Sequence, residues 1–145
     1  MNRLALLAAG TAGLAAFAIT PASATAQSAN ATATVTSCGN SGLQVGLSTR
    51  LCAEVTGNSV VFYGKVGLAG PAPVSKQLIA TLSAEVVGSG APNTQNWYAS
   101  FNSAPLELRG AANTVPCGST IRGTFGVASF PQSANPVTHE VTVTC

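Results

Sequence analysis

Strict alternation of apolar and polar residues constrains this chain most, because successive side chains of a β-strand point to opposite faces. The clearest example is 137–144, where three valines and a histidine alternate with three threonines and a glutamate. Similar alternation recurs in 60–66, 78–87, 97–101 and 121–127. No segment keeps a helical apolar stripe for long, so the pattern predicts short strands with one buried and one solvated face.

Turn-forming residues separate these runs at intervals of about a dozen residues. Gly57 and Asn58 follow one run, for example, and the Gly-Pro-Ala-Pro segment of 70–73 follows the next. This spacing predicts an all-β fold, an immunoglobulin-like antiparallel sandwich of seven or eight strands. A small barrel is the alternative. The run 78–87 also fits a helix, but its β-branched residues favour a strand.

The N-terminal segment indicates the compartment in which the protein works. Arg3 precedes a run from Leu4 to Ile19 that is almost entirely apolar, and Pro21 ends this run. Small residues at 24–26 suit a signal peptidase. We therefore expect a secretory signal peptide over 1–26, too short and too weakly flanked to anchor in a membrane.

The remaining residues suffice for one domain with one hydrophobic core. We expect an N-terminal arm over 27–37 and a disulfide-bonded β-sandwich domain over 38–145. Export also predicts an oxidising, extracellular environment, in which cysteines form disulfides.

The four cysteines allow three pairings. Of these, Cys38–Cys52 and Cys117–Cys145 are favoured, because sequence neighbours often close hairpins in such domains. The sequence has no Cys-x-x-Cys pair, so redox catalysis and zinc binding have little support. The cysteines are expected to be structural.

Charged residues are few after the expected cleavage site. Five basic residues stand against four glutamates, aspartate is absent, and the charges are scattered. Without a basic stripe to neutralise phosphates, nucleic-acid binding is not expected. The many Thr, Ser, Ala and Gly residues predict a neutral surface that is cheaper to desolvate than a charged one.

The sequence offers little for catalysis. His139 is the one histidine, and its alternation places it with valines on a strand face. The nucleophile motif of serine hydrolases is absent, since Gly88-Ser89-Gly90 lacks the strand-to-helix context. The four glutamates are isolated in sequence, so a glycosidase-like pair has little support. We expect no catalytic residue, no cofactor and no metal site.

The arm is the first candidate binding element. Its Thr32, Thr34, Val35 and Thr36 suit an extended conformation and carry no charge. Such a segment can add as an edge strand to a partner's sheet or fill a partner's cleft. It can equally pair within its own sheet, and the sequence leaves both interpretations open.

Two further segments suit protein binding. Alternation places Tyr98 opposite Trp97, so Tyr98 is the candidate exposed anchor and Trp97 a core residue. The loop from Lys65 to Lys76 contains two prolines, Pro71 and Pro73. A stiffened loop loses little entropy on docking, as a protease-inhibitor loop requires.

The mature region combines an Ala-rich signal, a Thr/Val-rich arm, a sandwich pattern and four cysteines, one of them at position 145. In size and layout it resembles the small secreted adaptor subunit of the umbrella toxin particles of Streptomyces. The resemblance implies an adaptor that joins a lectin-like subunit, built on an inactive trypsin-like domain, to a large toxin-bearing polypeptide. The segment from Gln27 to Ser37 would enter the cleft of the lectin-like subunit.

The sequence features favour a non-catalytic interaction module, and the resemblance implies an antibacterial assembly role for it among other secreted proteins. A secreted inhibitor of a protease or amylase is the alternative. A third possibility is a sandwich that carries a small ligand, which would require a wide cleft.

Overall fold

A computed structural model describes residues 33–72 and 74–145. All of them belong to one compact unit, Ala31–Cys145. The expected signal peptide (1–26) and the first part of the expected arm (27–32) lie outside the described residues. The described residues form nine strands: β1 (Thr34–Cys38), β2 (Gly42–Gln44), β3 (Leu47–Thr56), β4 (Ser59–Leu68), β5 (Lys76–Val86), β6 (Asn93–Phe101), β7 (Leu106–Thr114), β8 (Thr120–Ala128) and β9 (Val137–Thr142).

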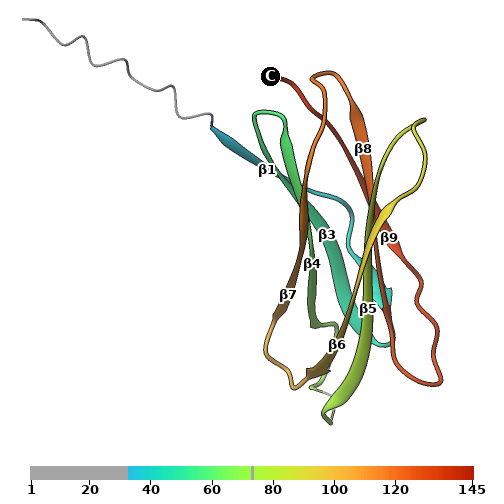
Figure 1. Cartoon of the computed structure of the whole chain (residues 1–145). Helices are drawn as coiled ribbons and strands as arrows, with labels where there is room; N and C mark the ends of the chain where they lie inside the picture. Colours follow the sequence, from blue (N-terminus) through green and yellow to red (C-terminus); the bar gives the residue numbers. More distant parts are fainter. Residues whose placement is uncertain (1–32, 73) are drawn as a thin grey trace, which may run out of the picture. The chain divides into compact units, whose positions relative to one another are not determined.

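The strands form two antiparallel sheets that pack face to face (Figure 1). One sheet has the order β1-β3-β4-β7, with β2 also paired to β3. The other has the order β6-β5-β8-β9. The predicted antiparallel sandwich is confirmed, and 78–86 is a strand rather than a helix. The ninth strand arises because the three-residue β2 continues the sheet edge after β1.

The core lies between the sheets and follows the predicted alternation. On β5, Leu78, Ala80, Leu82 and Ala84 are buried, and Ile79 between them is 42 % exposed. Burial of such side chains contributes about 1.5–3 kcal/mol for each large aliphatic or aromatic one.

Glycines in the facing strands let aromatic rings fill the space between the sheets. A Cβ at Gly64 on β4 would lie 2.3 Å from the Phe125 ring on β8. A Cβ at Gly123 on β8 would lie 2.5 Å from the Phe62 ring on β4. The two contacts are reciprocal, so each sheet accepts a ring of the other at a position that only glycine fits.

One buried amide links the two sheets. Gln44 on β2 donates from Nε2 to the Thr49 hydroxyl at 2.8 Å and to the Phe125 carbonyl at 3.1 Å. Its Oε1 accepts a hydrogen bond of 2.8 Å from the backbone N–H of Val127. The three hydrogen bonds of the Gln44 side chain are thus directed at β3 and β8.

Both predicted disulfides are present, Cys38–Cys52 and Cys117–Cys145. The first joins directly opposite residues of β1 and β3. The second fixes position 145, after the end of β9, to the loop that precedes β8. Together they hold both ends of the sandwich domain.

Candidate functional site

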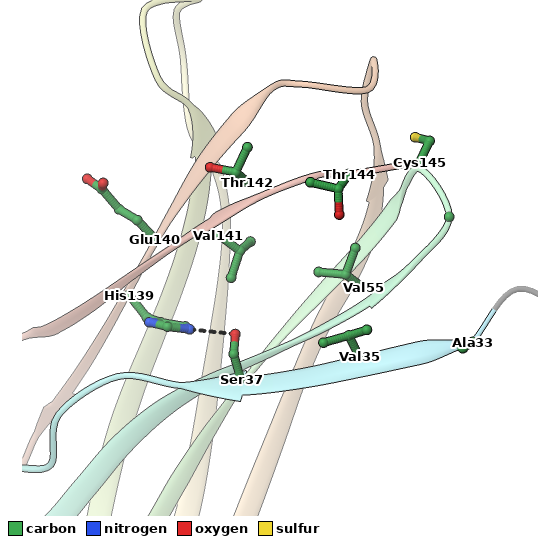
Figure 2. A pocket seen from close by; sticks show the side chains of 11 residues that line it. Ala33, Val35, Ser37, Val55, His139, Glu140, Val141, Thr142, Thr144 and Cys145 are labelled. Atoms are coloured by element: carbon green, nitrogen blue, oxygen red, sulfur yellow. Dashed lines mark hydrogen bonds between the residues drawn. The ribbon is translucent and has the colours of Figure 1, made fainter.

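Strand β1 is an edge strand, paired only with β3. Thr34 and Thr36 point to the outer face of the sheet, where the Thr34 hydroxyl lies 2.7 Å from that of Thr56. Val35 and Ser37 point the other way, toward β9 (Figure 2). An edge strand leaves backbone N–H and C=O groups unpaired along its free side. β1 therefore offers hydrogen-bonding groups to a further strand.

A cleft of about 340 Å³ opens between β1 and β9, which are edges of different sheets. Figure 2 shows the two edges diverging toward Ala33 and Cys145. Valines give the cleft an apolar lining. Val141 is 9 % exposed, but Val35 is 63 % exposed although it faces inward. The inward face of β1 is thus left uncovered at Val35, whereas Val141 on β9 is buried.

A hydrogen bond closes the narrow end of the cleft. The Ser37 hydroxyl lies 2.8 Å from Nε2 of His139, and this contact joins β1 to β9 (Figure 2). Gly39 permits the close approach, because a Cβ there would lie 2.9 Å from the Thr138 carbonyl oxygen. The two sheet edges are therefore held together at one end of the cleft and separate toward the other.

The chemistry of this contact depends on the state of His139. Burial lowers the pKa of His139 from its usual 6.5, so the imidazole is neutral at neutral pH. A hydroxyl beside a neutral imidazole is the beginning of a nucleophile–base pair, which normally needs a third group to orient the base. Within the described residues, each glutamate is instead bound by an arginine: Glu54 and Glu107 by Arg109, and Glu85 and Glu140 by Arg122.

The structure brings together only some of the residues singled out in the sequence. Thr34, Val35 and Thr36 lie on one edge strand, and Thr32 lies outside the described residues. Tyr98 is 84 % exposed, as its alternation predicted. It lies on β6, the edge of its sheet opposite β9, so it belongs to a different surface.

Sequence reasoning missed the residues that complete the cleft. Val55 and Val141 line it together with Val35. The alternation of 137–143 did place Val141 and His139 on one face. It carried no information on which strand of the other sheet lies opposite that face.

Comparisons with protein-family models, curated proteins and solved structures find no match for this chain. In 33–72 and 74–145, no three His, Cys, Asp or Glu side chains come together in a way that could hold a metal ion. The same residues contain no helix of the length and hydropathy needed to cross a membrane.

Proposed function

We propose that this protein is a non-catalytic, secreted interaction module whose β1–β9 cleft takes an extended segment of a partner protein. The observation that carries the proposal is the 63 % exposure of Val35 on the inward face of an edge strand. An apolar side chain on that face has no covering strand within the described part of the chain. A partner strand would supply both the cover and the missing backbone hydrogen bonds.

The lining of the cleft suits a neutral partner segment. Three valines and two threonines are among its eleven lining residues, and the carboxylate of Glu140 at its margin is bound to Arg122. Covering Val35 would contribute about 1 kcal/mol from burial. Main-chain pairing along β1 would add affinity without demanding particular side chains.

The resemblance to umbrella toxin adaptors gives the proposal its biological setting. In that setting the protein is exported and joins a lectin-like subunit to a large toxin-bearing polypeptide outside the cell. Within the described part of the arm, residues 34–37 belong to the edge strand β1 and are paired in their own sheet rather than forming a free extension. The two disulfides suit an oxidising exterior.

The test is affinity purification of the tagged protein from its native culture medium, followed by mass spectrometry. Val35→Lys places a charge in the cleft and is expected to lower recovery of the partner at least about tenfold, because the ammonium must be desolvated. Thr94→Lys adds the same charge to the exposed face of β6 and serves as the control. Circular dichroism of both variants confirms that they fold.

Large secreted polypeptides that follow the wild type and the Thr94→Lys variant, but not Val35→Lys, would support the proposal. Equal recovery with Val35→Lys would remove the cleft from the interface. A wild-type protein that elutes alone would contradict an adaptor role.

The inhibitor alternative rests on a separate feature, the loop between β4 and β5. This loop spans 69–75, and Val74 within it is 91 % exposed. An exposed aliphatic side chain on a short proline-containing loop is the arrangement that a protease pocket accepts. Stoichiometric inhibition of a secreted protease, lost in Val74→Gly and kept in Val35→Lys, would favour this function instead.

A further inference from the structure

Two cations on the outer face of the five-stranded sheet lie side by side without an acidic partner. Arg50 on β3 and Lys65 on β4 are directly opposite in the strand register. Both point outward, because their neighbours Leu51 and Val66 are buried in the core. Like charges in opposite positions of a sheet repel each other and destabilise it. The Lys65 ammonium lies over the Tyr63 ring, 5.3 Å from its centroid, and this contact does not neutralise its charge. The repulsion between the two cations therefore remains, and an anion would relieve it.

Arg50 and Lys65 have no acidic partner because the glutamates of the described chain are bound by other arginines. Arg109 and Arg122 bind all four glutamates. Glu107 stands opposite Lys65 on β7, but its carboxylate accepts a 2.8 Å hydrogen bond from Arg109. Among the described residues, no carboxylate lies within ion-pair distance of Arg50 or Lys65.

A hollow of about 330 Å³ lies beside the two cations. Gly67 forms part of its lining, and a Cβ built at Gly67 would have no neighbour within 4 Å. Ser48, which faces Gly67 in the register, and Pro105 complete the lining. The hollow thus exists because a glycine occupies an outward position of β4 between larger residues.

Arg50 is partly held in place for binding. Its Nε donates a 3.0 Å hydrogen bond to the Ser41 hydroxyl, which lies on the edge beside β2. This contact uses Nε and leaves the two terminal nitrogens for a ligand. A guanidinium in this state presents a planar donor fork that matches a carboxylate.

We infer that the Arg50–Lys65 hollow is a second docking site, which takes a carboxylate-bearing segment of a protein partner. The charge of the site selects an acidic ligand. The open space over Gly67 and the apolar ring of Pro105 accommodate the methylene groups of a glutamate side chain. Leu43, opposite Ser48 and 66 % exposed, extends the surface with an apolar contact that a peptide can use and a free anion cannot.

This inference does not depend on the β1–β9 cleft, and its test uses purified protein. We would titrate isotope-labelled protein at low ionic strength with a capped glutamate-rich peptide and follow backbone amide resonances. Saturable shifts centred on Ser41, Ser48, Arg50, Lys65 and Gly67 are expected. They should weaken on addition of salt, which screens exposed charges. The glutamine counterpart of the peptide and inorganic phosphate are the comparison ligands.

Three variants that each remove one positive charge distinguish binding at the hollow from attraction by the protein's net charge. Lys65→Gln and Arg50→Gln are expected to weaken peptide binding about tenfold, the loss of one charge-assisted hydrogen-bonded contact. Lys76→Gln removes the same charge from a residue outside the hollow, whose ammonium donates to the Val45 carbonyl, and is expected to leave binding unchanged.

Equal weakening in all three variants would show unspecific attraction and overturn the inference. Shifts caused by phosphate but not by the peptide would overturn the peptide ligand, and absence of saturable shifts would overturn the site. Partner recovery in the culture-medium experiment is a separate readout, so failure here leaves the test of the cleft intact.

Discussion

At the scale of single residues, the contact between Ser37 and His139 joins the edges of the two sheets. It joins side chains 102 residues apart and fixes the narrow end of the cleft. Burial favours the neutral imidazole, which lowers the pKa of His139. The neighbouring carboxylate of Glu140 is bound by Arg122, so it does not offset this effect with an ion pair to the imidazole.

The pKa of His139 predicts how stability depends on pH. Because its pKa is lower in the folded than in the unfolded protein, the unfolded state binds the proton first as the pH falls. The free energy of unfolding should therefore be steady above about pH 7 and decrease as the pH drops below about 6.5. Urea denaturation between about pH 7.5 and pH 5 measures this, in a window above the usual titration of carboxylates.

His139→Gln keeps a hydrogen-bonding side chain at the position but does not titrate. Its free energy of unfolding should stay level over the same window. A parallel decrease in both proteins would assign the pH dependence to other groups.

At the scale of strands, β2 has a role out of proportion to its three residues. Gln44 is 1 % exposed and makes hydrogen bonds to β3 and across the core to β8. Through Gln44, the short strand therefore connects the two sheets by hydrogen bonds inside an otherwise apolar core. A buried network of this kind is stabilising only while every member has its partner.

Gln44→Met should destabilise the domain strongly. The substitution roughly keeps the side-chain volume but leaves the Val127 N–H and the Phe125 carbonyl without their partner. The expected loss is about 3 kcal/mol in the free energy of unfolding, measured by guanidinium denaturation. The matched control is Gln77→Met, whose amide contacts Ser100 on the exposed face. It should change stability by less than about 0.5 kcal/mol, and equal losses would contradict a special role for Gln44.

At the scale of the whole domain, the two disulfides act on different lengths of chain. Cys38–Cys52 spans a sequence separation of 14 residues, whereas Cys117–Cys145 spans 28. Closing the longer loop removes more conformational entropy from the unfolded chain. It also holds the segment after β9 against the loop before β8, where Val143 exchanges backbone hydrogen bonds with Gly118 and Ser119.

Replacing Cys117 and Cys145 together by serine should lower the free energy of unfolding by about 3.5 kcal/mol. Replacing Cys38 and Cys52 should lower it by about 3 kcal/mol, because that loop is shorter. Calorimetry under non-reducing conditions measures both losses. A loss below about 1 kcal/mol for the first pair would show that strand pairing alone holds the C-terminal segment.

Much of the fold follows from local patterns. Alternation assigned the buried face of β5 and β8 and the exposure of Tyr98, because a strand's pleat fixes the side to which each residue points. The disulfide pairing followed from proximity in sequence. These features depend on short stretches of chain.

Features that depend on distant strands did not follow. Gln44 is buried while its neighbour Leu43 is exposed, the reverse of their hydropathies, because β8 supplies polar backbone partners. Val35 faces inward yet remains open to solvent, because β9 diverges from β1. Alternation predicts the side of the sheet to which a side chain points. Whether that side is covered depends on how the sheets pack.

The position of Trp97 has a practical consequence. It is the chain's one tryptophan, half-buried on β6 and packed against the core. It lies on the edge of its sheet opposite β9, and hence away from the cleft. Indole fluorescence responds to the water around the ring, so its emission reports loss of the core and not occupation of the cleft. Trp97 is therefore a built-in optical probe of unfolding. Its fluorescence can be followed in the same sample in which partner binding is measured, and independently of that binding.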